Sequence, residues 1–165
     1  MLAPFAFSWS GLAVCLALYL VAGFGVTLGY HRLLTHRSFQ TPRVVEYLLA
    51  VLGGLAHLGG PLQWVAVHRI HHQHSDAAGD PHSPRHGLWW VALLTLGEGW
   101  HNNHHAFPRS ARHGFRWWEL DATYALIRLL GLVGLARRIH VPGKVLRQAA
   151  AAARRGEKAG ELVPS

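Results

Sequence analysis

Cysteine is almost absent from this sequence of 165 residues, since Cys15 is the only one. A single thiol excludes both an internal disulfide framework and a zinc site built from several cysteines. Charge is scarce as well, because 15% of the residues are charged, against about a quarter in a typical soluble domain. The shortage is uneven: residues 1–30 carry no charge, and residues 44–67 carry only Glu46. Two apolar runs of this length are typical of a membrane protein.

Acidic residues are few, and 16 Lys and Arg against 8 Asp and Glu give a formal net charge of +8. The basic residues flank the apolar runs and do not alternate with aromatic residues along one surface, as single-stranded nucleic-acid binding would require. We therefore expect no nucleic acid and interpret them as anchors at a lipid bilayer. The first apolar run lacks the basic start of a secretory signal and is too long for one, which predicts a retained segment.

The two apolar runs predict different membrane segments. Ser10–Tyr30 is long enough to cross a hydrocarbon core of about 30 Å as one helix. Three arginines follow within 13 residues, which places that end on the cytoplasmic side. The second run, 44–67, is interrupted by Gly53-Gly54, His57 and Gly59-Gly60-Pro61. Pro and paired Gly break or kink helices, so we expect this run to lie in the interface or to enter the membrane and return.

The remaining segments complete an expected all-α integral membrane fold. Residues 76–85 form a turn-rich loop, residues 87–100 a short apolar helix, and residues 111–138 an amphipathic helix or pair of helices. Trp117 and Trp118 are expected at the membrane interface. Residues 1–146 are expected to form a single domain, and the Ala- and Arg-rich residues 147–165 a disordered tail.

Histidine is the residue in excess, with 14 copies, and eight of these fall into three spaced clusters. The second and third clusters share the pattern H-x-x-H-H, whose positions i, i+3 and i+4 lie on one face of an α-helix and so offer three imidazoles to one point. The two histidines of the first cluster are five residues apart and diverge on an ideal α-helix, so the helix must end or distort between them. The clusters are His31 and His36, then His68, His71 and His72, then His101, His104 and His105.

Eight imidazoles are too many for one tetrahedral zinc ion, but they suit two metal ions with open positions for oxygen. Imidazole binds iron, copper, nickel and zinc, so the ligands alone do not name the metal. Because all eight ligands are neutral, nearby carboxylates are expected to orient them and offset the metal charge, and Asp76, Asp80 and Glu98 are suitably placed. If the first two clusters share metals, they must lie on the same side of the membrane.

The other six histidines carry weaker signals. A single histidine near an apolar segment is usually a hydrogen-bonded structural residue, which is the interpretation for four of them. Two more, close to the second cluster, remain open between a structural and a functional role. The structural four are His57, His86, His113 and His140, and the open two are His74 and His82.

Four motifs resemble the membrane fatty acid desaturases, and are closest to bacterial acyl-CoA (Δ9, stearoyl-CoA-type) members. They are GYHRLLTHRSF (29–39), HRIHHQHSD with GDPHSPR (68–85), GEGWHNNHHAFP (97–108) and WWELDATY (117–124). The resemblance implies two iron ions bound by the eight clustered histidines on the cytoplasmic face, in a bacterial inner membrane. It also implies O2-dependent formation of a cis double bond in a fatty acyl chain carried on coenzyme A or another carrier.

The same resemblance implies an electron donor, which would be a ferredoxin, a rubredoxin or a cytochrome b5-like protein. Arg69, Arg85 and Arg109 are candidates for contacting that donor or the coenzyme A phosphates. The chain departs from the family in the 28 residues between His72 and His101. There the family carries two further membrane crossings and an Asn-Ser-x-x-His motif, so the chain resembles a truncated and internally deleted desaturase.

Three functions therefore compete. The first is a fatty acid desaturase, an oxidoreductase whose activity depends on how much of the site survives the missing segments. The second is a fatty acyl or alkane hydroxylase on the same metal site. The third is a membrane metal-binding protein without catalysis.

Overall fold

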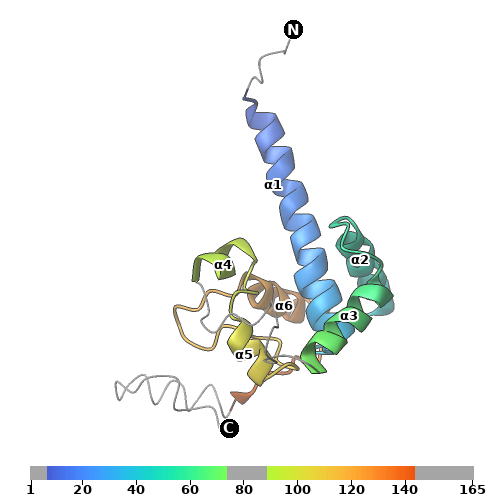
Figure 1. Cartoon of the computed structure of the whole chain (residues 1–165), viewed down its shortest axis with the longest axis vertical. Helices are drawn as coiled ribbons and strands as arrows, with labels where there is room; N and C mark the ends of the chain where they lie inside the picture. The colour runs from blue at the N-terminus through green and yellow to red at the C-terminus, as the bar shows by residue number, and fades with distance from the viewer. Residues whose placement is uncertain (1–6, 74–88, 144–165) are drawn as a thin grey trace.

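The computed structural model describes residues 7–73 and 89–143. These residues form helices and contain no strand, only one isolated antiparallel bridge between Gln40 and Arg137. The expected all-α fold is thus confirmed, and Figure 1 shows the shorter elements gathered around one end of a long helix. The elements are α1 (Trp9–Phe24), the π-helix η1 (Gly25–Thr35), α2 (Arg43–Gly54), α3 (Pro61–Gln73), α4 (Trp89–Leu94), α5 (His101–Ala106) and α6 (Ala122–Leu132).

The long helix is formed by α1 and η1 together. Ser8 caps its start by accepting a hydrogen bond from Gly11 N at 3.2 Å. Trp9–Thr35, 27 residues in all, is long and apolar enough to cross a membrane, as predicted for Ser10–Tyr30. The first turns of α1 project beyond the other elements (Figure 1) and contain no buried residue. An apolar helix left uncovered by protein is the arrangement expected of a helix surrounded by lipid.

The helix widens into η1 where the first histidine cluster begins. In a π-helix the backbone bond runs between residues five apart, and His36 N donates to His31 O at 3.2 Å. Residues five apart therefore lie on the same side, and the His31 and His36 rings meet edge to face with centroids 4.9 Å apart. The distortion predicted between these two histidines is real, and its form is a π-helix.

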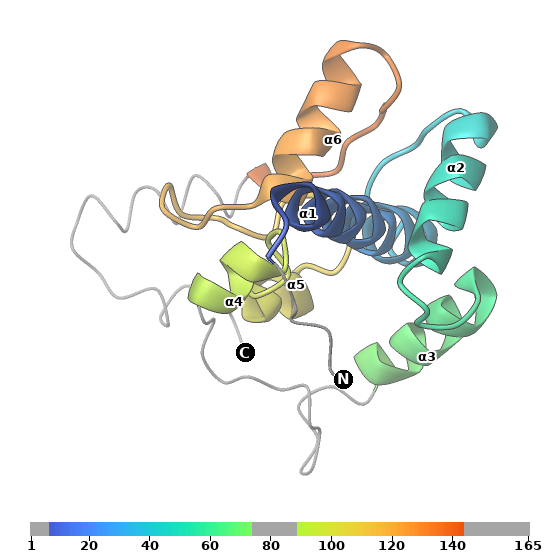
Figure 2. The same cartoon turned by 90° about the horizontal axis from the view of Figure 1, so that it is seen from above.

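Glycine lets η1 and α2 approach each other closely. A Cβ at Gly25 would lie 2.3 Å from Gly53 N, and a Cβ at Gly53 would lie 2.6 Å from Tyr30 Cε1. A side chain at either position would force the two backbones apart. This contact places α2 against the histidine end of the long helix, as seen along that helix in Figure 2.

The second apolar run is two helices, as its glycines and proline predicted. Between α2 and α3 the backbone turns at His57 (φ 55°) and Gly59 (φ 91°), and Pro61 begins α3. The chain then returns toward the end of η1, so that α3 runs beside it in Figures 1 and 2. The second cluster consequently finishes next to the first, as two clusters sharing metals require.

The expected helix over 87–100 is wrong beyond Leu94, and residues 87–88 lie outside the described residues. Leu96 (φ 58°) and Gly97 (φ 113°) adopt left-handed backbone conformations that end α4. Gly97 N donates to Ala92 O at 2.7 Å, which closes the helix end. A Cβ at Gly97 would lie 2.6 Å from Asp121 Oδ1, so close packing as well as φ favours glycine here.

The expected helix or helix pair over 111–138 is also wrong, because only α6 is helical. Before α6, two carboxylates accept hydrogen bonds from backbone N–H groups: Asp121 accepts from His113 N, and Glu119 accepts from Arg116 N. Such side-chain acceptors compete with helical bonds and favour turns and caps. Asp121 also caps α6 by accepting from Tyr124 N at 2.9 Å. Trp117 is exposed, with 89% of its surface accessible.

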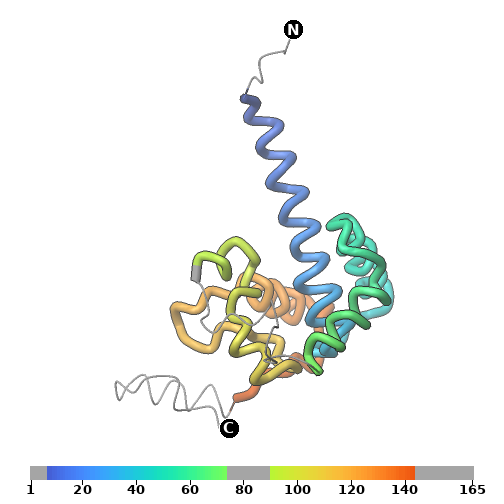
Figure 3. Tube along the Cα trace, viewed as in Figure 1, coloured from blue at the N-terminus to red at the C-terminus, as the bar shows by residue number. Residues whose placement is uncertain are grey.

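The core lies where η1, α2 and α6 meet. After α6 the chain passes back beside the segment that follows η1 (Figure 3), where Gln40 and Arg137 exchange backbone hydrogen bonds of 2.8 Å. The predicted loop 76–85 and tail 147–165 lie outside the described residues. The buried core residues are Leu28, Leu33, Phe39, Leu49, Ala111, Ile127 and Ala136.

Candidate metal centre

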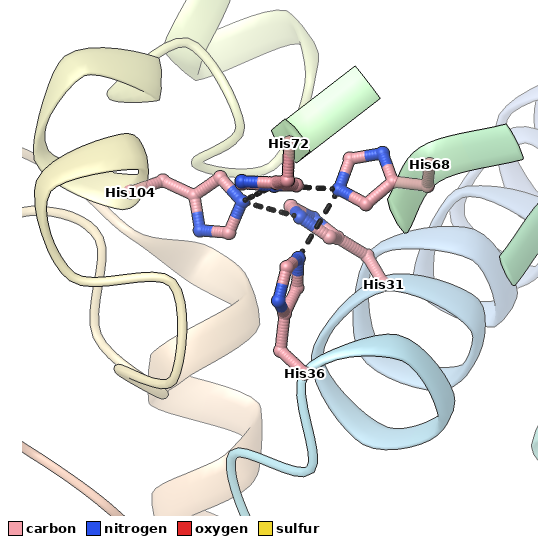
Figure 4. A group of neighbouring side chains, drawn as sticks. All are labelled: His31, His36, His68, His72 and His104. Carbon is pink, nitrogen blue, oxygen red and sulfur yellow. Dashed lines mark hydrogen bonds between the residues drawn. The ribbon is translucent and has the colours of Figure 1, made fainter. Parts of the chain in front are cut away.

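All eight clustered histidines gather at the end of the long helix, in two adjoining groups. The larger, called here the five-histidine group, is drawn in Figure 4, where its rings point toward one another from η1, α3 and α5. The ligand-capable atoms of each group lie within 4.8 Å of one another. The five-histidine group contains His31, His36, His68, His72 and His104, and the three-histidine group contains His71, His101 and His105.

The spacing of the ring nitrogens matches that of ligands around an ion. In the five-histidine group the Nε2 atoms of His31 and His104 are 2.9 Å apart, those of His72 and His104 are 2.9 Å apart, and those of His36 and His68 are 3.1 Å apart. Two nitrogens bound at about 2.1 Å from one ion with a right angle between the bonds would be about 3.0 Å apart. The geometry therefore fits a metal bound through Nε2.

The three-histidine group offers fewer ligands. The Nε2 atoms of His71 and His105 are 3.2 Å apart. The two groups adjoin where the rings of His72 and His105 stack with centroids 4.5 Å apart. Two ions, one in each group, would be close neighbours, and the ion with three protein ligands would have more open positions.

Each H-x-x-H-H cluster divides its histidines between the two groups, so the expectation of three imidazoles aimed at one point is wrong. On an α-helix, position i+4 is rotated about 40° from position i, whereas position i+3 is rotated about 60° the other way. In α3 the pair His68 and His72 joins the five-histidine group and His71 joins the other. In α5 the pair His101 and His105 joins the three-histidine group and His104 joins the other.

Burial favours the neutral form of several clustered imidazoles, and metal binding requires that form. Loss of hydration, reinforced by neighbouring positive charge, lowers the pKa of His72 to about 4 and that of His101 to about 3. The same two causes lower the pKa of His36 and of His104 well below the usual value. At neutral pH each of these four rings therefore has one nitrogen whose electron pair is available to a metal ion.

An unpartnered atom supports the same conclusion. His101 Nε2 is buried and has no hydrogen-bond partner among the described residues. A buried polar nitrogen without a partner costs about 1–3 kcal/mol. Several nitrogens whose electron pairs face one another at close range add repulsion, which a cation between them removes. The donor set, neutral imidazoles only, suits a divalent transition metal such as iron.

A carboxylate lies behind the five-histidine group. Glu98 accepts a hydrogen bond from His31 Nδ1, which leaves His31 Nε2 on the metal side. Glu98 Oε1 also accepts from Arg32 Nη2 at 3.0 Å. Burial raises the pKa of Glu98, while the charge and hydrogen bond of Arg32 oppose that rise. The sequence placed Glu98 near the site, and the structure places it against a histidine of the first cluster.

Arg32 and Asp121, near the site, were missed or interpreted otherwise from the sequence, and His113 is hydrogen-bonded as expected of a structural residue. Arg32 is completely buried and pairs with Asp121 Oδ1 at 2.9 Å as well as with Glu98. His113, expected to be structural, is buried with its ring centroid 4.5 Å from that of His104, and its Nδ1 is 3.0 Å from Arg32 Nη2. One feature of the sequence could have indicated this arrangement: Arg32 comes just after a membrane-length apolar run. An arginine buried there requires carboxylates nearby.

The other sequence-based candidates are either outside the described residues or belong to neither histidine group. Asp76, Asp80 and Arg85, together with His74, His82 and His86, lie outside the described residues. Arg69 donates to Thr35 O at 3.3 Å at the end of η1, and Arg109 is exposed. His57 and His140 are exposed and belong to neither histidine group.

Fold and site together define a helical protein with a membrane-length helix and paired histidine groups able to hold metal ions. No protein-family model matches the sequence. The chain is 35% identical to the sn-1 stearoyl-lipid 9-desaturase of Anabaena variabilis, with 86% of this chain and 88% of that protein covered. It is 32% identical to the acyl-CoA C20 Delta5-desaturase of Anemone leveillei, with 87% and 78% covered. It is 29% identical to the Delta-9 acyl-lipid desaturase 1 of Arabidopsis thaliana, with 90% and 81% covered.

The chain belongs to the membrane fatty acid desaturase family, a family of oxidoreductases associated with membranes. The alignment with the Anabaena protein extends over 239 positions, more than the 165 residues of this chain. That relative therefore has residues with no counterpart here.

Proposed function

We propose that this protein introduces a cis double bond into a fatty acyl chain, using O2 and two iron ions held by the eight clustered histidines. The observation that carries the proposal is the convergence of histidines from η1, α3 and α5 into two adjoining groups with ligand-like spacing. Family membership supports the substrate class, because the relatives are named as fatty acyl desaturases.

The protein's own residues would hold and orient the metals. The five-histidine group would bind one ion through Nε2 atoms, with His31 held in the correct tautomer by Glu98. The three-histidine group would bind the other ion and leave positions open. Bound iron supplies the O2-dependent oxidation that an unactivated alkyl carbon requires and that no side-chain acid or base can perform.

The remaining parts of the proposal concern partners and location. The acyl group would be carried on coenzyme A or on a lipid, as the names of the relatives include both. A ferredoxin, a rubredoxin or a cytochrome b5-like protein would supply electrons, with exposed arginines such as Arg69 and Arg109 available to an acidic partner. The arginines after the long helix favour a site on the cytoplasmic face of a bacterial inner membrane, with residues 1–146 as one domain.

The test is to express the full chain with iron and a reductase system in a host that lacks the product. Acyl chains are then analysed by mass spectrometry, with the His71→Ala variant as control. The proposal predicts products that have lost two hydrogens, formed by the unchanged chain and not by the variant. A product that has gained one oxygen would instead identify a hydroxylase.

A second candidate is a membrane metal-binding protein without catalysis. It is favoured by the residues of the Anabaena relative that have no counterpart in this chain. It predicts bound metal without O2-dependent consumption of the reductant. Iron bound at two ions per chain, with no product and no oxygen uptake, would decide for this candidate.

A further inference from the structure

A buried guanidinium lies directly behind the candidate metal centre. Arg32 follows the first clustered histidine and has 0% of its surface exposed. Its Nη1 donates to Ala111 O at 2.8 Å and to Asp121 Oδ1 at 2.9 Å. Its Nη2 contacts Glu98 Oε1 and His113 Nδ1, each at 3.0 Å. The two terminal nitrogens thus hold three chain segments, at residues 98, 111–113 and 121, against η1.

The position of Glu98 depends on this guanidinium. One carboxylate oxygen of Glu98 faces Arg32, and the other faces His31 Nδ1. Because Arg32 occupies the first oxygen, the second is the one left to accept from the imidazole. A hydrogen bond to Nδ1 fixes the tautomer of a metal-binding histidine and the orientation of its ring.

We propose that Arg32 is a positioning residue of the metal centre, which holds Glu98 against His31 so that His31 Nε2 is presented to the metal. This inference rests on the proposed function, because it assumes that the five-histidine group binds a metal. Arg32 belongs to neither histidine group. It acts through Glu98.

The same contacts decide the role of His113. His31, Glu98 and His113 bring three potential ligand atoms within 4.8 Å of one another, which by itself suggests a third metal position. Arginine has donors only, so His113 Nδ1 must accept from it and the ring hydrogen sits on Nε2. The guanidinium therefore takes the place that a cation would occupy among these residues. His113 is a support for Arg32 and not a ligand.

Lysine could not replace Arg32 in this role. The planar fork of a guanidinium reaches several acceptors at fixed angles, whereas an ammonium is a compact point charge with three donors. Arg32 contacts both Glu98 and Asp121, which are 23 residues apart in the sequence. Glu98 precedes α5, and Asp121 follows it. A lysine at position 32 would keep the charge but lose the geometry that links the two carboxylates.

A double-mutant cycle tests the inference on the full chain in detergent. The variants are Arg32→Gln, Glu98→Gln and the double variant, with Arg128→Gln as the matched control, because Arg128 is an exposed residue of α6. Affinity for Co2+ alone is measured by competition with a chelating dye, and the Co2+ absorption spectrum reports the ligand geometry. Helix content by circular dichroism shows which variants are folded.

Loss of a group that orients a metal ligand typically costs about 10- to 100-fold in metal affinity, and we expect a loss of this size in Arg32→Gln. If Arg32 acts through Glu98, adding Arg32→Gln to Glu98→Gln changes the affinity by less than about threefold. The control should bind Co2+ like the unchanged chain. The Co2+ spectrum of Arg32→Gln should be altered even at saturating metal.

Equal affinity in Arg32→Gln and the unchanged chain would overturn the inference, as would losses that multiply in the double variant. Should Arg32→Gln be unfolded, Arg32→Lys keeps the charge and is expected to fold with weakened Co2+ binding; undiminished binding there would also overturn it. Failure of the unchanged chain to bind Co2+ is a different result, which would refute the proposed metal centre itself.

Discussion

At the scale of single residues, the site depends on which nitrogen of each imidazole faces the centre. His104 has a special position, because its Nε2 lies 2.9 Å from the Nε2 atoms of both His31 and His72. It is also completely buried. It therefore connects the ligands from η1 and α3, and no other residue of α5 belongs to the five-histidine group.

His104→Ala is predicted to lower the affinity of the five-histidine group for metal by at least about 100-fold, since loss of outer-shell groups alone costs 10- to 100-fold. Metal content per chain, measured by elemental analysis after dialysis, should fall by about half. His57→Ala is the control, because His57 is exposed and belongs to neither group. Full metal content in His104→Ala would contradict the assignment of His104 as a ligand.

At the scale of elements, η1 does two things that an α-helix could not do together. Its π-helical bonding places His31 and His36 on one side, and its glycines let α2 approach. The sequence predicted a distortion here but not its kind, since the five-residue spacing is equally compatible with a helix that simply ends. The structure shows which form it takes, with Gly25 and Gly29 of η1 packed closely against α2.

Gly25→Ala is predicted to destabilise the protein by about 1–3 kcal/mol or more, the range for overpacking, because its Cβ would lie 2.3 Å from the backbone of α2. Thermal unfolding in detergent, followed by circular dichroism, measures the effect. Gly11→Ala on exposed α1 is the matched control, where a Cβ meets nothing closer than 3.6 Å. There alanine should be neutral or stabilising by up to about 1 kcal/mol. Equal melting temperatures in the two variants would show that η1 and α2 do not pack this closely.

At the scale of the whole molecule, the long helix separates an uncovered apolar half from the half that carries the site (Figure 1). Leu16 and Leu20 are exposed on the uncovered half. In water this surface would favour aggregation, whereas in a bilayer it is solvated by lipid. The histidine groups lie at the opposite end of the same helix, where a water-facing partner and a membrane-dissolved substrate could both arrive.

Leu16→Arg is predicted to impair membrane insertion, because an arginine near the centre of a spanning helix costs about 2.5–3.5 kcal/mol on insertion scales. The fraction of protein recovered in carbonate-washed membranes measures insertion. Leu120→Arg is the control, since Leu120 is also exposed but lies in the segment before α6. If both variants insert like the unchanged chain, the long helix does not span the bilayer.

The sequence by itself determined the features that depend on local order: the membrane-length run, the break between α2 and α3, and the eight histidines at helical spacing. Hydrophobicity, Gly-Pro interruptions and i, i+3, i+4 repeats act within a few residues, so they can be read along the chain. Only the tertiary structure decided how the histidines divide into groups of five and three, and that Arg32 joins Glu98 to Asp121. Helical rotation separates position i+3 from i and i+4 within each cluster, but the meeting of the clusters and the contacts of Arg32 join segments 30 to 90 residues apart, which no local pattern encodes. The helix predicted over 111–138 was wrong because Glu119 and Asp121 accept hydrogen bonds from backbone N–H groups in that segment. Periodicity alone would have assigned those groups to a helix.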